Sequence, residues 1–144
     1  ESEELLALVK KRVNMRKDRE YFHSVAKREI FVFAGDMSWI RHTEDIIKGA
    51  TRRKVNYCVL FCKKNATSLR NAKRFKRIGA KVRYYPDLGD LRGIIVDGEI
   101  ISLVLKKFKG AEESEYSVIN INNKLIGDVF RRYFVSLWDK AERI

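Results

Sequence analysis

A hairpin signal in the second half of the chain constrains the fold more than any other feature. Asp97-Gly98 is a dipeptide that favours a two-residue turn between antiparallel strands. The apolar run Gly93 to Val96 precedes it and is typical of a short buried strand. Ile100 to Leu105 follows as the returning strand. We therefore expect an antiparallel pair of strands here.

The residues before this hairpin predict another strand and a turn. Lys81 to Tyr85 alternates in polarity and carries aromatic and β-branched side chains, as strands do. Pro86 to Gly89 has the composition of a turn. Gly79 is the expected stop of a helix that ends just upstream.

Farther upstream, apolar strands and helices alternate. Glu29 to Ala34 and Val55 to Cys62 are apolar runs typical of buried strands. Ser38 is the expected N-cap of a first helix, and Ala66 to Ile78 has the apolar spacing of a second. The order strand, helix, strand, helix, strand predicts an α/β fold. We expect a mostly parallel sheet with flanking helices and the added hairpin.

The two ends of the chain are predicted to be helical. Residues 1–28 carry two apolar lines at helical spacing, formed by Leu5, Leu8, Met15 and Phe22 and by Leu6, Val9 and Val13. They indicate either an amphipathic helix packed on the core or a dimerising linker. We expect residues 1–24 to be a helical linker and dimerisation segment, and residues 25–144 to be the α/β domain.

A strand and a helix close the chain in this interpretation. Tyr116 to Ile121 is expected to be a short strand. Asn122 or Asn123 then caps a last helix over Lys124 to Arg143. Its apolar side is expected to contain Leu125, Val129, Phe130, Tyr133, Phe134, Leu137 and Trp138.

The positive charge of the chain is concentrated in one segment. The formal net charge is +12, yet Lys48 to Pro86 holds 13 Lys or Arg and no acid, so the remainder is close to neutral. Within it, one side of the predicted helix carries four cations and the preceding loop two: Arg70, Lys73, Arg74 and Arg77, with Lys63 and Lys64. This pattern indicates either a nucleic-acid-binding surface or a solvated face.

Other features narrow the class of protein. Cys58 and Cys62 would lie on one strand face roughly 13 Å apart, too far for a disulfide, so we expect free thiols in a reducing cytoplasm. With no His nearby we expect no zinc, and no other cofactor is indicated. The sequence has no apolar run of membrane-spanning length, and its first residues lack the apolar stretch expected of a signal peptide. A charged fraction of 35% without any Gln favours a thermophile.

The layout around the hairpin resembles the phospholipase D superfamily, whose motif is His-x-Lys-x4-Asp. With the motif Asp at Asp97, its Lys falls on Arg92 and its His on Asp90. The family's reaction needs an imidazole nucleophile, which a carboxylate cannot replace, and an arginine keeps its proton. We therefore expect no catalysis. Asp90, Arg92 and Asp97 would be either turn and strand-end residues or the remnant of an anion pocket.

The order of the motifs narrows the resemblance. The segments Glu29-Ile30-Phe31-Val32-Phe33, Ala50-Thr51-Arg52-Arg53-Lys54-Val55 and Gly93-Ile94-Ile95-Val96-Asp97-Gly98 precede a terminal Phe134-x2-Leu137-Trp138-x2-Ala141. Together they resemble the C-terminal effector domain of archaeal TrmB-type transcription regulators. That family places a winged helix-turn-helix before this domain, often through a helical dimerisation linker. Lys54 departs from the family's usual Gly, and the dense basic face argues against a neutral sugar ligand.

The resemblance implies a regulatory, ligand-sensing homodimer. A small anionic ligand would lie beyond the carboxyl ends of the parallel strands. Its expected contacts are Asp36, Ser38, Trp39, Lys63, Lys64, Tyr85, Asp90 and Arg92. The alternative is a nucleic-acid-binding module that uses the Lys48 to Arg83 surface, with contacts expected from Lys63, Lys64, Arg70, Lys73, Arg74 and Arg77. The two are compatible if the effector domain also contacts the DNA backbone.

Overall fold

The computed structural model describes residues 6–11, 15–38, 43–89, 91–106 and 116–144. The elements follow one another as β1 (Leu6–Lys11), α1 (Met15–Val25), β2 (Glu29–Ala34), α2 (Glu44–Arg52), β3 (Asn56–Phe61), α3 (Ala66–Arg77), β4 (Lys81–Tyr84), η2 (Pro86–Leu88), β5 (Arg92–Val96), β6 (Ile100–Lys106), β7 (Tyr116–Asn122), α4 (Lys124–Lys140) and β8 (Glu142–Arg143). The expected order of strand, helix, strand, helix and strand is therefore present from β2 to β4.

One sheet contains all eight described strands, in the order β1-β7-β6-β5-β2-β3-β4-β8. Among them, only β2 with β3 and β3 with β4 pair in parallel, and the other five pairs are antiparallel. The expectation of a mostly parallel sheet is wrong. Just seven residues separate β4 from β5, whereas a parallel crossover needs about a dozen or more. β5 therefore starts at the edge where β4 ends, and it runs antiparallel to β2.

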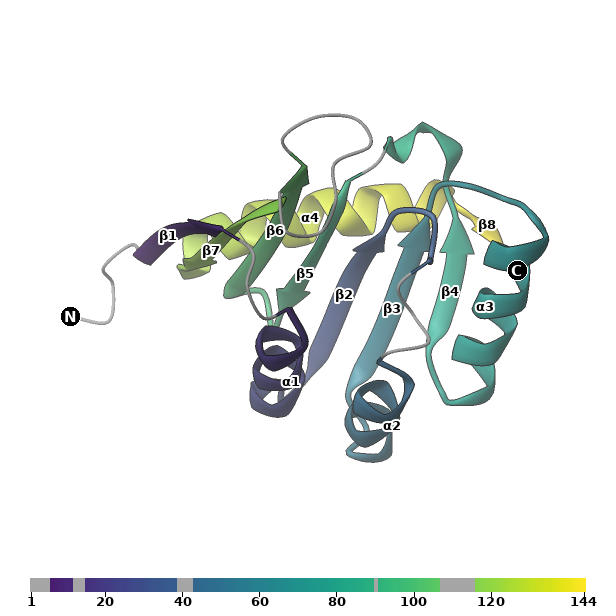
Figure 1. Cartoon of the computed structure of the whole chain (residues 1–144), viewed down its shortest axis with the longest axis horizontal. Coiled ribbons are helices and arrows are strands. Elements are labelled where there is room, and N and C mark those ends of the chain that lie inside the picture. Colours follow the sequence, from purple (N-terminus) through teal and green to yellow (C-terminus); the bar gives the residue numbers. More distant parts are fainter. Residues whose placement is uncertain (1–5, 12–14, 39–42, 90, 107–115) are drawn as a thin grey trace.

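The sheet is covered on both faces (Figure 1). One core lies under α1, α2 and α3 and includes Phe22, Ile47 and Phe75. The other lies under α4 and includes Phe33, Phe134 and Leu137. Side chains alternate between the two faces along β2, so this strand contributes to both cores. Val32 points to the first core, and its neighbours Phe31 and Phe33 point to the second. Two helical layers thus flank one sheet.

The hairpin lies where its sequence predicts, but its connection has three residues and not two, because Val96 pairs with Ile100. β5 and β6 pair antiparallel from Arg92 with Val104 to Val96 with Ile100. Asp97 has φ 53° and Gly98 has φ 66°, so both central residues have the positive φ that a type I′ turn requires. Asp and Gly are favoured there because they tolerate this backbone region at low cost.

The N-terminal expectation holds in part. Met15–Val25 is helical and buries Phe22, but Leu6–Lys11 is a strand paired with β7 from Leu6 with Asn122 to Lys11 with Ser117. The helical reading of that stretch is therefore wrong. A short apolar run is compatible with a helix or a strand. Here the pairing with β7 makes it a strand. Leu5 and Val13 lie outside the described residues. The division of the chain at residue 24 stays a prediction.

Helix boundaries follow their capping residues. α2 begins at Glu44 after Thr43, so the expected start at Ser38 is wrong, and Trp39 lies outside the described residues. Asn65 and Ser68 form a reciprocal capping box at the start of α3. Asn123 accepts hydrogen bonds at the start of α4, as expected, but this helix ends at Lys140 and β8 follows. Cys58 and Cys62 are free thiols, as predicted.

Candidate functional site

Asp97, at the motif's acid position, ties the hairpin to the start of β2. Its carboxylate accepts hydrogen bonds from the backbone N–H groups of Lys27, Arg28 and Glu29 at 2.8, 2.8 and 2.9 Å. Partial burial opposes the charged form, but these bonds outweigh burial and lower the pKa of Asp97. The arrangement gives Asp97 a structural role, because its carboxylate binds the backbone at the start of β2.

Arg92, at the motif's lysine position, lies against the end of β2. Its guanidinium donates to Asp36 Oδ1 at 3.2 Å, and the same oxygen accepts from the backbone N–H of Ser38 at 3.0 Å. The structure thus brings together three of the predicted ligand residues at the carboxyl edge of the sheet. Asp90, which stands in the nucleophile position, lies outside the described residues.

The other predicted ligand residues lie elsewhere on that edge. Lys64 pairs with Glu142 at 2.8 Å and sits over the Tyr84 ring at 5.1 Å. Tyr85 packs on the core beneath α4. Lys63 is exposed. Lys64 and Tyr85 therefore make contacts of their own, apart from the contact between Arg92 and Asp36.

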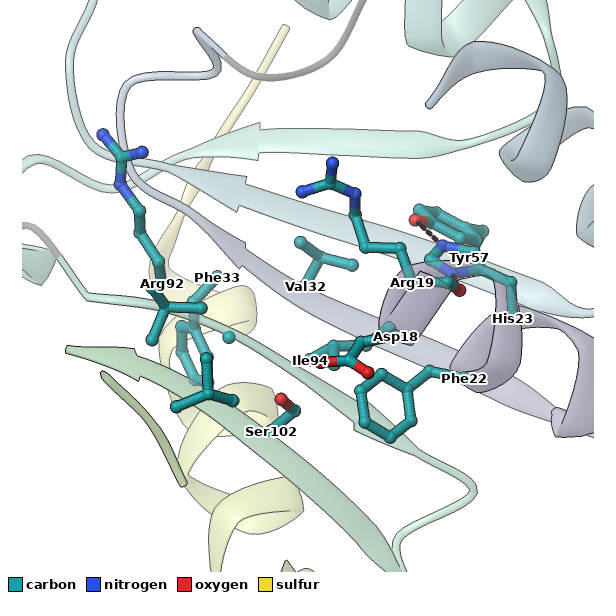
Figure 2. A pocket seen from close by; sticks show the side chains of 13 residues that line it. Asp18, Arg19, Phe22, His23, Val32, Phe33, Tyr57, Arg92, Ile94 and Ser102 are labelled. Atoms are coloured by element: carbon teal, nitrogen blue, oxygen red, sulfur yellow. Dashed lines mark hydrogen bonds between the residues drawn. The ribbon is translucent and has the colours of Figure 1, made fainter. Parts of the chain in front are cut away.

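A pocket that the sequence did not reveal lies between α1 and the sheet (Figure 2). Its volume is about 120 Å³, and its lining is largely apolar. The polar lining comes from Asp18, Arg19 and His23 of α1, with Arg92 of β5 and Ser102 of β6. Figure 2 shows the guanidinium groups of Arg19 and Arg92 extending toward the same side. Helical spacing could have indicated this pocket, since Asp18, Arg19, Phe22 and His23 share one face of α1.

The inner wall of this pocket is polar but uncharged. His23 Nε2 lies 2.7 Å from the Tyr57 hydroxyl, and Nδ1 lies 2.6 Å from the carbonyl of Arg19. Burial lowers the pKa of His23 to about 4, so the imidazole is neutral at pH 7. The carbonyl can only accept, so Nδ1 donates to it and Nε2 accepts from Tyr57. Burial also raises the pKa of Tyr57, which keeps its proton.

The predicted basic face is an exposed side of α3, but two of its six cations are paired. Arg74 donates to Glu44 of α2 at 2.7 Å, and Lys64 is held by Glu142. Glu44 lies just before the acid-free segment and Glu142 lies far from it in sequence, so a count of acids within the segment missed both. Four cations of α3 are exposed and pair with no Asp or Glu in the described part of the chain: Arg70, Lys73 and Arg77 on the predicted face, and Lys76, which donates to the Ile144 carbonyl.

Two further features of the described residues bear on the kind of site. Within the ranges that the structure describes, no three His, Cys, Asp or Glu side chains gather as a metal site would require. None of the described helices combines the length and apolarity needed to cross a membrane.

The fold is that of phospholipase D-like proteins. No family model matches the chain, and no curated protein matches it in sequence. Nuc, a phospholipase D family member from Salmonella typhimurium, superposes with a TM-score of 0.81 at 16% identity, over 98% of this chain and 99% of Nuc. NucT from Helicobacter pylori gives 0.73 at 13% identity, over 98% of this chain and all of NucT. These matches confirm the expected fold family.

A DNA-binding protein shares this fold. TrmBL2, an archaeal chromatin protein with a novel mode of DNA binding, gives a TM-score of 0.76 at 22% identity. The match covers 96% of this chain but 54% of TrmBL2, so the chain spans about half the length of that protein. At these identities the likeness to all three structures establishes the fold alone.

Proposed function

We propose that this chain is a non-catalytic regulatory domain that contacts the backbone of duplex DNA through the outer face of α3. The observation that carries the proposal is the set of three exposed cations, Arg70, Lys73 and Arg77, on one side of one helix. Like charges at this spacing destabilise a helix, and phosphates would offset that repulsion. TrmBL2 supports the choice of DNA as partner, since its fold is the same.

The geometry of the three cations suits a backbone contact. From Arg70 to Arg77 the helix advances about 10 Å, and one DNA strand carries a phosphate about every 3.4 Å of axis. The face offers charge and few side chains suited to reading base edges, because Asn71 is buried and donates to the Met37 carbonyl. Binding is therefore independent of sequence. Lys63, on the loop before the helix, extends the same charge.

The absence of catalysis is part of the proposal. Asp97 is engaged by three backbone N–H groups, and Arg92 binds Asp36, so neither is positioned as a proton-transfer partner. The scaffold of a phosphodiesterase would thus remain while a regulatory role has replaced the reaction. We expect no turnover of bis-p-nitrophenyl phosphate or DNA, with or without a divalent metal. Turnover lost in Asp90→Ala would contradict this.

The wider setting follows the TrmB-type resemblance. In that setting the chain belongs to an archaeal, thermophilic transcription regulator in the cytoplasm, with a winged helix-turn-helix elsewhere in the protein. The sequence that flanks this chain in its gene would test that part of the proposal.

Fluorescence anisotropy with a labelled random duplex tests the DNA contact. We expect weak binding at 50 mM salt, and loss of that binding in the triple variant Arg70→Glu, Lys73→Glu, Arg77→Glu. The matched control reverses the same number of charges at exposed lysines away from α3: Lys27→Glu, Lys124→Glu, Lys140→Glu. The control should bind within about threefold of the wild type. If both variants lost DNA binding equally, binding would depend on net charge alone, and the α3 face would not be a specific DNA contact.

A second function, ligand sensing, is favoured by the pocket beneath α1. An engineered apolar cavity of about 150 Å³ holds benzene, so 120 Å³ suits a molecule of five or six carbons. Arg19 and Arg92 both line this pocket, and their guanidinium groups supply positive charge and N–H donors there. The expected ligand is a small apolar carboxylate, with its carboxylate at Arg19 and Arg92 and its apolar end near Ile94 and Val118.

Amide chemical-shift changes on addition of 4-methylpentanoate test this second function. We expect saturable shifts for residues around the pocket, and no comparable shifts with the neutral analogue 3-methylbutan-1-ol. Arg92→Gln should weaken binding, and Lys140→Gln should not. Shifts that are absent, or equal for the acid and the alcohol, would remove the carboxylate site and leave the DNA contact unaffected.

A further inference from the structure

The outer face of α4 exposes a line of large apolar side chains. Leu125, Val129 and Tyr133 follow one another at four-residue spacing and are 81%, 64% and 46% exposed. Tyr21 is the one other exposed large hydrophobic residue in the described part of the chain. The opposite side of α4 is already packed on the sheet through Phe134 and Leu137. Leu125 and Val129 therefore contribute little to packing within the domain, whereas the Tyr133 ring also lies 6.0 Å from the Phe33 ring.

A charged pair runs beside this line. Asp128 and Arg132 form an ion pair at 2.8 Å within the helix, and their side chains are 49% and 78% exposed. In helical projection they lie on one flank of the outer face, while Tyr133 lies on the other. The face thus has an apolar centre and an acid and a base four residues apart on one edge.

We propose that this α4 face is a homodimer interface in which two copies of the helix pack antiparallel about a two-fold axis near Val129 and Phe130. The charges on this face are complementary to those on the same face of a second copy. In an antiparallel pair, Asp128 of one copy lies opposite Arg132 of the second copy, and the symmetry repeats the contact. Leu125 then packs against Tyr133 of the second copy, and the two Val129 side chains meet at the axis.

The size of the face sets the strength of the dimer. Seventeen residues of helix extend about 25 Å, which gives an interface at the small end of specific protein contacts. We expect dissociation in the micromolar range. The interface is on the face of the sheet opposite α3 (Figure 1), so this inference does not rest on DNA binding. It also differs from the expectation that residues 1–24 form a helical dimerisation segment, in which Leu6–Lys11 is a strand paired with β7.

Sedimentation velocity of the full chain from 5 to 200 µM is the first test. The wild type should shift from monomer to dimer across this range. Val129→Asp should stay monomeric, because it places two carboxylates at the axis. Lys73→Glu on α3 is the control and should dimerise like the wild type. Thermal melts matched to the wild type would show that Val129→Asp is folded. A wild type that stays monomeric, or a Val129→Asp protein that still dimerises, would overturn the proposal.

Charge reversal gives a second test that does not depend on burying a charge. In Asp128→Arg, the new arginine lies opposite Arg132 of the second copy. In Arg132→Asp, the new aspartate lies opposite Asp128 of the second copy. Each variant should therefore dimerise at least tenfold more weakly than the wild type. Mixed in equal amounts, the two variants should form a heterodimer, because their charges are then complementary. The double variant Asp128→Arg, Arg132→Asp should dimerise alone. A failure of both the mixture and the double variant to recover dimer would place the interface elsewhere.

Discussion

Helices α3 and α4 lie on opposite faces of one sheet and differ in what they present outward. Their inner faces are alike, since Phe75 and Phe134 are almost fully buried. Outward, α3 presents cations and α4 presents apolar side chains. Inner faces hold the domain together, whereas outer faces are free to select partners. We infer that one scaffold contacts DNA on one side and a second copy of itself on the other.

The largest effect should come from the inner faces, where the two helices are equivalent. Phe75→Ala and Phe134→Ala should each lower the free energy of unfolding by about 3–5 kcal/mol, because each opens a cavity in a packed core. Urea denaturation followed by circular dichroism measures both. If either change cost less than 1 kcal/mol, that helix would not be anchored as the two cores indicate.

A glycine pair sharpens the comparison at the α4 side. A Cβ at Gly127 would collide with the backbone of Gly98 in the hairpin, while a Cβ at Gly49 of α2 has open space around it. Gly127→Ala should destabilise the protein by about 1–3 kcal/mol through overpacking and weaken dimerisation by shifting α4. Gly49→Ala should be neutral or stabilise by up to about 1 kcal/mol. Thermal melts and sedimentation would distinguish them, and equal effects would show that α4 does not depend on the hairpin.

A smaller, pH-dependent effect is expected where Asp97 ties the hairpin to β2. Asp97→Asn should cost about 1–2 kcal/mol at pH 7, at the low end for a charged acceptor because the site is partly exposed. The pKa of Asp97 is lowered in the folded protein. Its contribution is therefore present above the unfolded pKa of about 3.9 and is lost as pH falls through the folded pKa. The difference between wild type and variant should shrink below pH 4, and a constant difference would contradict this.

Local signals in the sequence predicted most elements of the fold. Asp97-Gly98 marked the hairpin, Asn123 marked the start of α4, and β2, β3 and β4 lie where apolar runs predicted strands. Strand direction was missed because it depends on the length of the connection after β4. β1 was missed because a short apolar run has no decisive period, and its partner β7 lies more than a hundred residues away in sequence.

The candidate site was less accessible to sequence reasoning. The exposed side of α3 was correctly located, but the pairing of Arg74 with Glu44 and of Lys64 with Glu142 depends on tertiary contacts. His23 and Tyr57 are 34 residues apart in sequence and hydrogen-bonded in the structure. The predicted apolar side of α4 combines residues that are buried, such as Phe134, with Leu125 and Val129, which face outward.

The salt dependence of DNA binding tests the central claim most directly. Each neutralised phosphate contributes about 0.9 to the slope of log Kobs against log salt. Wild type should therefore give a slope near −2.7 for three contacts, and Arg70→Ala, Lys73→Ala and Arg77→Ala should each reduce its magnitude by about 0.9. Lys140→Ala on α4 should leave the slope unchanged. Identical slopes for wild type and all three α3 variants would contradict the assignment of DNA to this helix.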